Sequence, residues 1–337
     1  RVENTLLESA IAFMEGGNHA AAVKTYEALL LLKPDSADVH VNLGKAYRLA
    51  GETEKARPLF ERMLMRYPDS ENAAKELDAI YVYSRADVTE EIKQAQDNHA
   101  ERYWRTLVDE HPDTALPRLY LGITLERSGR LEAAMKWYAE ALAIERDYAP
   151  ALYRMGALDV AFGDVKGGLE RIEQAAKKDP ALSGEISRRC DELAAYCVER
   201  KRYDDARLLY ETALAVSPGD LWPRVHLGEL YELLGDADAA LSCYRAVLMA
   251  VPDSPVTAKK MNDLLQRLSL DEGVAVAEWR AIAEKHPDAA IPHYYLGVAL
   301  QQAGDEEGAV RAYTQAATLN PELPEVRERL DTLVPPK

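Results

Sequence analysis

Three cysteines and seven histidines are the residues of this 337-residue chain best suited to bind a metal or to form a disulfide. Cys190 and Cys197 lie seven positions apart, about 10 Å along one helix, whereas a disulfide needs Cα atoms within about 7 Å. None of the cysteines belongs to a CxxC pair, and the histidines are scattered. We therefore expect reduced structural thiols, no metal site and no cofactor.

Two His-Pro-Asp tripeptides, at positions 111–113 and 286–288, are a second candidate for function. In J-domain cochaperones this tripeptide lies in the loop that contacts an Hsp70 partner, and a basic helix precedes it. Here proline is followed by aspartate at five places, and the residue before proline varies. Because proline ends a helix and aspartate can cap the next one, the sequence predicts recurrent turns with the aspartate as the cap.

Signatures of catalysis are absent from the sequence. It contains no P-loop, zinc-protease or nucleophile-elbow motif. The glycine cluster GDVKGGLE, residues 163–170, lacks the lysine and hydroxyl pair that binds phosphate and magnesium, and it coincides with a predicted turn. Acidic runs such as YDDARL stand where helices begin, and there they favour the helix dipole. We expect no enzymatic activity.

The elements that carry these residues repeat with a period of 34 residues, marked by prolines at 34, 68, 112, 180, 218, 252, 287 and 321. Each unit is predicted to be a helix, a glycine turn, a second helix and a proline turn. Alanine recurs at position 20 of the unit, with Gly168 as the exception, and a large ring recurs at position 24, with Ile172 as the exception. The rings should fill the core between units: Tyr26, Phe60, Trp104, Tyr138, Tyr210, Tyr244, Trp279 and Tyr313.

This pattern resembles the tetratricopeptide repeat family over nearly the whole chain, as about nine units that begin near residues 3, 37, 71, 115, 149, 187, 221, 256 and 290. The resemblance implies an all-α, right-handed α-solenoid superhelix of helical hairpins, forming a single domain over residues 1–337. A solvating helix is expected at 323–333. In units 3 and 8, Asp78 and Asp263 replace the small residue of the first helix.

Two insertions and a duplication modify the array. Ten extra residues before Trp104 predict a lengthened second helix that starts near Thr89, with a possible offset or hinge at 84–100. Four extra residues before Leu193 predict a long first helix in unit 6. Residues 100–146 also resemble residues 275–321 at a shift of 175. This similarity indicates either two like binding surfaces or recent common ancestry.

In the family, positions 2, 5, 6, 9, 12 and 13 of the first helix commonly face the concave groove. The resemblance therefore implies partner-binding residues that are rich in rings and aliphatic groups. Groove rings can also simply pack against the next unit, and both interpretations stay open. The implied contacts are Asn42, Lys45, Arg48, Tyr120, Ile123, Tyr153, Arg154, Trp222, His226, Glu229, Tyr294 and Tyr295.

A formal net charge of −16 disfavours nucleic acid and anionic membranes as partners, and no apolar run is long enough to span a bilayer. A basic or apolar protein segment fits better. The main hypothesis is a non-enzymatic interaction scaffold. Two alternatives are a substrate-recognition arm of a larger enzyme, such as a protein glycosyltransferase, and a self-assembling structural protein. The compartment stays open, because a chain that begins at Arg1 does not exclude a removed signal peptide.

Overall fold

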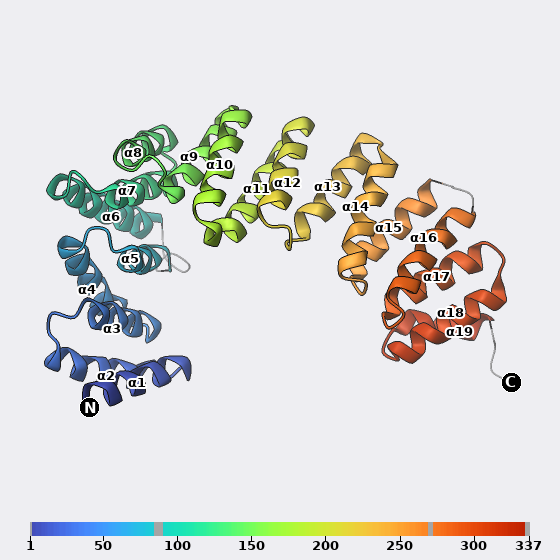
Figure 1. Ribbon diagram of the computed structural model, residues 1–337, viewed down its shortest axis with the longest axis horizontal. Coiled ribbons are helices and arrows are strands. Elements are labelled where there is room, and N and C mark those ends of the chain that lie inside the picture. The colour runs from blue at the N-terminus through green and yellow to red at the C-terminus, as the bar shows by residue number, and fades with distance from the viewer. Residues whose placement is uncertain (1, 84–89, 269–271, 334–337) are drawn as a thin grey trace. The chain divides into compact units, whose positions relative to one another are not determined.

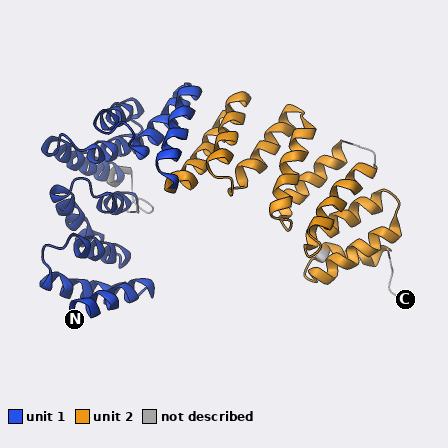
Figure 2. Ribbon diagram, viewed as in Figure 1, with its two compact units in different colours: residues 1–180 blue, residues 181–337 orange. Residues whose placement is uncertain are grey.

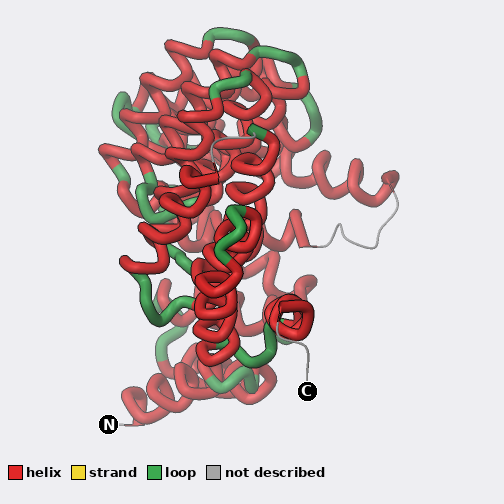
Figure 3. Tube along the Cα trace, turned by 90° about the vertical axis from the view of Figure 1, so that its right-hand side faces the viewer, coloured by secondary structure: helices red, strands yellow, loops and turns green. Residues whose placement is uncertain are grey.

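The computed structural model describes residues 2–83, 90–268 and 272–333, and every regular element in these ranges is helical (Figures 1 and 3). Successive helices form hairpins, and the second helix of each hairpin also packs on the first helix of the next one within the same unit. The predicted all-α fold of repeated helical hairpins is thus confirmed.

The chain divides into two compact units, residues 1–180 and residues 181–337 (Figure 2). A single 3-10 turn, η1 (Pro180–Leu182), lies at the division. The N-terminal unit contains α1 (Val2–Glu15), α2 (His19–Leu32), α3 (Ala37–Leu49), α4 (Thr53–Arg66), α5 (Glu71–Tyr83), α6 (Glu90–Glu110), α7 (Ala115–Arg127), α8 (Leu131–Ile144), α9 (Ala149–Phe162) and α10 (Val165–Lys178).

The C-terminal unit is built in the same way. It contains α11 (Ser183–Glu199), α12 (Tyr203–Val216), α13 (Trp222–Leu234), α14 (Ala237–Ala250), α15 (Pro255–Arg267), α16 (Glu272–Lys285), α17 (Ala290–Gln302), α18 (Glu306–Leu319) and α19 (Pro324–Leu333). Odd-numbered helices up to α17 are first helices of repeats, and even-numbered ones are second helices. The end helix α19 buries Val326 and packs Leu330 and Leu333 against the core, as predicted.

The large side chain at position 24 of each second helix, a ring in eight repeats and Ile172 in repeat 5, lies in the core of its repeat. All eight predicted rings are buried, and the two largest, Trp104 and Trp279, have no exposed surface. Glycines of the first helices provide the room for these rings, since a Cβ on Gly122 would lie 2.4 Å from the Tyr138 ring. Within these repeats, the glycine of the first helix therefore packs directly against the ring of the second helix.

The turn between the two helices of a repeat needs a residue with positive φ. Glycine takes this conformation in six repeats, at Gly17, Gly51, Gly129, Gly163, Gly235 and Gly304. In repeat 6 the same place is taken by Lys201, which is held at φ 58°. A side chain with a Cβ is strained in this left-handed region.

Lys201→Gly should therefore stabilise the protein. Relief of the left-handed strain contributes about 1–2 kcal/mol, and the greater freedom of an unfolded glycine offsets about 0.5–1 kcal/mol of it. We expect a net gain of about 0.5–1 kcal/mol in the free energy of unfolding, measured by denaturant titration. An unchanged or lower midpoint would show that Lys201 is not strained.

The capping role predicted for the aspartate after each proline is wrong. The first helices begin one residue later, and α3 is capped by Ser36, whose hydroxyl accepts from the Val39 amide at 3.4 Å. The His-Pro-Asp copies are turns, but Thr114 and Ala289 occupy their cap positions. Aspartates cap second helices instead, as Asp164 does for Gly167 N at 3.0 Å.

The insertions lengthen helices as expected. The second helix α6 has 21 residues and the first helix α11 has 17, although the predicted start at Thr89 lies outside the described residues. Repeat 8 is shifted by one residue from its prediction, because α15 begins at Pro255 after Ser254. The small-residue position there holds the buried Asn262, and Asp263 is exposed.

Candidate functional site

The predicted contacts lie on first helices in both units. Those of the N-terminal unit are on α3 (Asn42, Lys45, Arg48), α7 (Tyr120, Ile123) and α9 (Tyr153, Arg154). Those of the C-terminal unit are on α13 (Trp222, His226, Glu229) and α17 (Tyr294, Tyr295). We consider each unit by itself.

Two of the predicted rings are core residues of the N-terminal unit. Tyr120 is 6% exposed and Tyr153 is 4% exposed, so neither offers much apolar surface to water. Tyr120 stacks on Trp104, with ring centroids 5.0 Å apart and an interplanar angle of 21°. Burial is the main cause of the raised pKa of Tyr120. Of the two interpretations left open for the groove rings, packing within the array describes these two.

Two of the charged side chains on this face, Arg48 and Arg154, pair with the neighbouring repeat. Arg48 of α3 donates to Glu76 of α5 at 2.6 Å, and Arg154 of α9 lies 3.6 Å from Glu126 of α7. Position 12 of one first helix thus meets position 6 of the next. These partners were not predicted, although opposite charges at these two positions of adjacent repeats are visible in the sequence. Asn42 and Ile123 are half-buried, and Lys45 is exposed.

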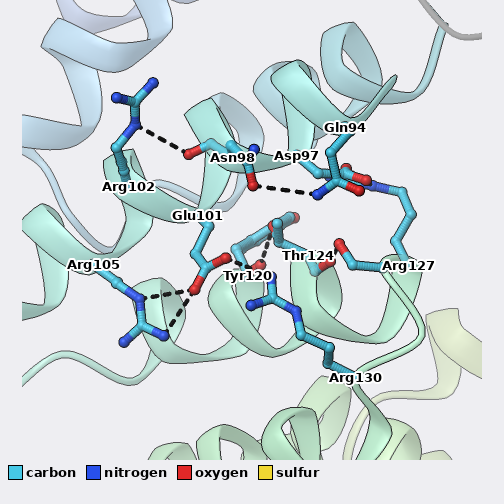
Figure 4. Close-up of polar contacts among 11 residues, drawn as sticks. Gln94, Asp97, Asn98, Glu101, Arg102, Arg105, Tyr120, Thr124, Arg127 and Arg130 are labelled. Carbon is cyan, nitrogen blue, oxygen red and sulfur yellow. Dashed lines mark hydrogen bonds and ion pairs between the residues drawn. The ribbon is translucent and has the colours of Figure 1, made fainter. Parts of the chain in front are cut away.

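Several ion pairs and hydrogen bonds join the lengthened helix α6 to α7 (Figure 4). Arg127 of α7 reaches Asp97 of α6 at 3.1 Å and Asp78 of α5 at 2.8 Å. Glu101 of α6 accepts from Arg105 and Arg130, and these cations lower the pKa of its carboxyl. The unusual acid Asp78 is therefore neutralised by Arg127, which ties three helices together.

In the C-terminal unit, α13 carries the most exposed predicted ring. Trp222 is 59% exposed and stacks on His226, with centroids 6.0 Å apart and an interplanar angle of 29°. The Nδ1 atom of His226 lies 2.7 Å from a carboxylate oxygen of Asp191 on α11. Glu229 pairs with Lys260 of α15. Three neighbouring first helices therefore hold Trp222 and its surroundings.

The contact with Asp191 raises the pKa of His226, and burial opposes this rise only in part. The nearby charges are Glu229, which also raises the pKa, and Lys260, which lowers it. Because the folded pKa lies above the unfolded value of about 6.5, the pair contributes its full stability below that pH. The contribution is lost as the pH rises through the folded pKa.

His226→Gln should therefore destabilise the protein more at about pH 5.5 than at about pH 9. The comparison is the difference in free energy of unfolding between parent and variant at each pH, from denaturant titration. Asp191→Asn is the matched control, and it should remove most of the same pH dependence. A difference that does not change with pH would contradict the assigned pair.

The tyrosines of α17 repeat the arrangement of the N-terminal unit. Tyr295 stacks on Trp279 at 4.8 Å and 18°, as Tyr120 stacks on Trp104. Tyr294 adds a second ring at 4.9 Å from Tyr295, and both tyrosines are half-buried. The duplication seen in the sequence is thus also a duplication of packing.

The three cysteine thiols lie in the protein interior. Cys190, Cys197 and Cys243 are free and buried, and burial raises the pKa of the Cys190 thiol to about 12. Within residues 2–83, 90–268 and 272–333, no three His, Cys, Asp or Glu side chains are grouped to hold a metal ion. No helix in these ranges has the length and apolar character to cross a membrane.

Models of the tetratricopeptide repeat match residues 7–71, 98–150, 198–261 and 290–323. The chain belongs to the tetratricopeptide repeat family. Tetratricopeptide repeats indicate a scaffold for protein interactions, and proteins of this kind bind protein or peptide partners. Trp222, His226 and Glu229 lie on the first helix of one of these repeats, α13.

The chain spans about a quarter or less of the length of the curated relatives that it matches. Protein CTR9 homolog of Arabidopsis thaliana is 24% identical over 304 residues, which cover 86% of this chain and 27% of that protein. Cellulose synthase operon protein C of Komagataeibacter xylinus is 28% identical over 123 residues, 36% of this chain and 9% of that protein. The solved structure of YrrB, a TPR protein with an unusual peptide-binding site, is 19% identical with a TM-score of 0.33, covering 68% of this chain and 98% of its own.

Proposed function

We propose that the protein is a non-enzymatic scaffold that binds a protein segment on the first-helix face of its C-terminal unit, with Trp222 as the anchor. The observation that carries this proposal is an indole that is 59% exposed on the first helix α13. Its backbone amide donates to Asp220 at 3.3 Å, and its ring rests on His226. A rigid aromatic ring that loses little entropy on binding is the usual centre of a binding hot spot.

The surface around Trp222 extends along α13. Trp222, His226, Glu229 and Leu233 follow one another at spacings of four, three and four residues, so they share one helix face. Leu233 is 58% exposed. Apolar groups thus stand at both ends of this stripe, with paired charges between them. A segment with two apolar side chains about 16 Å apart would match this spacing.

A hollow beside the stripe offers polar contacts to the same segment. It has a volume of about 570 Å³ and lies between α13 and α15, lined by Glu232, Lys260, Asp263, Gln266 and Arg267. Arg267 pairs with Glu232 across the hollow. Since acids and bases balance here, we infer that polar or mixed side chains enter it. Tyr294 and Tyr295 of α17 are proposed as further contacts.

Phage-displayed random peptides selected on the folded chain test the proposal. Peptides selected on the parent should bind Trp222→Ala at least 30-fold more weakly, the effect of losing a hot spot of about 2 kcal/mol. Leu234→Ala is the matched control, because Leu234 is 47% exposed on the same helix but lies off the stripe. Peptides that bind Trp222→Ala as well as the parent would overturn the proposal.

A further inference from the structure

A second surface, separate from the α13 face, lies on the second-helix side of repeats 1 and 2. It is an open hollow of about 840 Å³ whose apolar lining comes from α2, α3, α4 and the turn after α2. The lining residues are Leu30, Leu31, Pro34, Leu43, Tyr47, Pro58 and Leu59, with Glu27, Glu54, Lys55 and Arg62 at the polar positions. The hollow is thus mainly aliphatic and is bordered by charges of both signs.

Leu31 stands at this hollow with 86% of its surface exposed. It is the most exposed large apolar side chain in the described part of the chain. The same position of the repeat holds Ala143, Lys177, Ala215, Glu284 and Thr318 in later repeats, and apolar Met65 and Met249 in two others. An aliphatic side chain in water beside an apolar hollow gains free energy when a partner covers both.

The charges at the hollow are balanced, two acids against two bases. Glu54 pairs with Arg57 at 3.0 Å, and Lys55 pairs with Glu52 at 2.5 Å. Arg62 donates its Nε to the carbonyl of Pro58 at 3.2 Å and has no carboxylate partner in the described residues. Near the end of α4 the hollow thus keeps the exposed cation of Arg62, and near the start of α4 it has Glu54 beside Lys55, whose charge is paired with Glu52.

These charges have the symmetry of a self-complementary pair. Glu54 and Arg62 lie four residues to either side of Pro58, so each is about 6 Å from Pro58 along α4. Two copies of α4 in antiparallel contact, with a two-fold axis near Pro58, would place Arg62 of one chain against the partner's Glu54. The two-fold relation makes each contact occur twice.

We propose that a second copy of this chain docks on the hollow, with Leu31 of each chain entering the hollow of the other. The charge pattern favours this occupant over an unrelated protein, because the surface complements itself. The hollow lies in the N-terminal unit and the proposed peptide site in the C-terminal unit, so the two sites share no residue. The inference is therefore independent of the proposed function.

Light scattering and sedimentation of the whole chain over increasing concentration test the dimer. The mass should rise from 37.5 kDa toward twice that value. Leu31→Asp should weaken dimerisation at least tenfold, because it places a carboxylate in the apolar hollow. Leu32→Asp is the matched control: Leu32 is 50% exposed but does not line the hollow, and its variant should dimerise as the parent does.

A charge exchange tests the two-fold arrangement in the same assay. Glu54→Arg alone and Arg62→Glu alone should each weaken the dimer, and the double exchange should restore it. Circular dichroism melts confirm that each variant is folded. A parent chain that stays monomeric at every concentration overturns the proposal, as does a Leu31→Asp variant that dimerises like the parent.

Discussion

Truncating either buried tryptophan, Trp104→Ala or Trp279→Ala, should lower the free energy of unfolding by about 3–5 kcal/mol. Both indoles are fully buried, and each stacks on the tyrosine of the following first helix. Removal leaves a cavity between two repeats and removes the stacking partner of Tyr120 or Tyr295. Because protein interiors are close-packed, neighbouring side chains cannot fill a space of this size without a helix moving.

The two variants should act on different parts of the chain, because Trp104 lies in the N-terminal unit and Trp279 in the C-terminal unit. In a repeat array most stabilising contacts are between neighbours. Denaturant titration followed by circular dichroism should therefore show one early transition and one nearly unchanged one in each variant. Trp222→Ala is the control, and this exposed site should cost about 0.5 kcal/mol or less. Equal losses at all three sites would refute the assigned packing.

The repeat pattern predicted the fold because the same contact between a ring and a small residue recurs in most repeats. A ring at one position and a small residue at another are enough to place the two helices of a hairpin against each other. The buried Tyr138 beside Gly122 shows this directly. Helix lengths also followed from the spacing, since an insertion such as that before Trp104 must lengthen an element or a loop.

The features that the sequence did not predict, the burial of groove rings and the ion pairs between repeats, depend on the distances between neighbouring repeats. The family resemblance implied that Tyr120 and Tyr153 face the groove, but it did not show that neighbouring side chains bury both rings. Nor did it show that Arg48 and Arg154 meet carboxylates of the neighbouring repeats. Capping failed for a local reason, because the aspartate after proline lies one residue too early to reach the exposed amides.

In repeat 5 the sequence pattern and the observed packing favour different residues at position 20. Eight repeats have alanine at position 20, so the pattern alone would favour Gly168→Ala, and glycine inside a helix usually costs up to about 1 kcal/mol relative to alanine. Repeat 5 also replaces the ring of position 24 by Ile172. With this smaller core residue, α9 and α10 approach through Gly156 and Gly168.

Gly168→Ala should therefore destabilise the protein by about 1–3 kcal/mol, the cost of overpacking a close contact. Its Cβ would lie 2.6 Å from the carbonyl oxygen of Gly156 and 3.0 Å from the amide nitrogen of Val160, both of them backbone atoms that cannot rotate away. Gly184→Ala is the matched control, since nothing lies within 4 Å of its new Cβ, and it should be neutral or slightly stabilising. The measurement is the free energy of unfolding of the two variants. If Gly168→Ala proves as stable as Gly184→Ala, the two helices do not approach through their glycines, and the absence of a ring in repeat 5 needs another explanation.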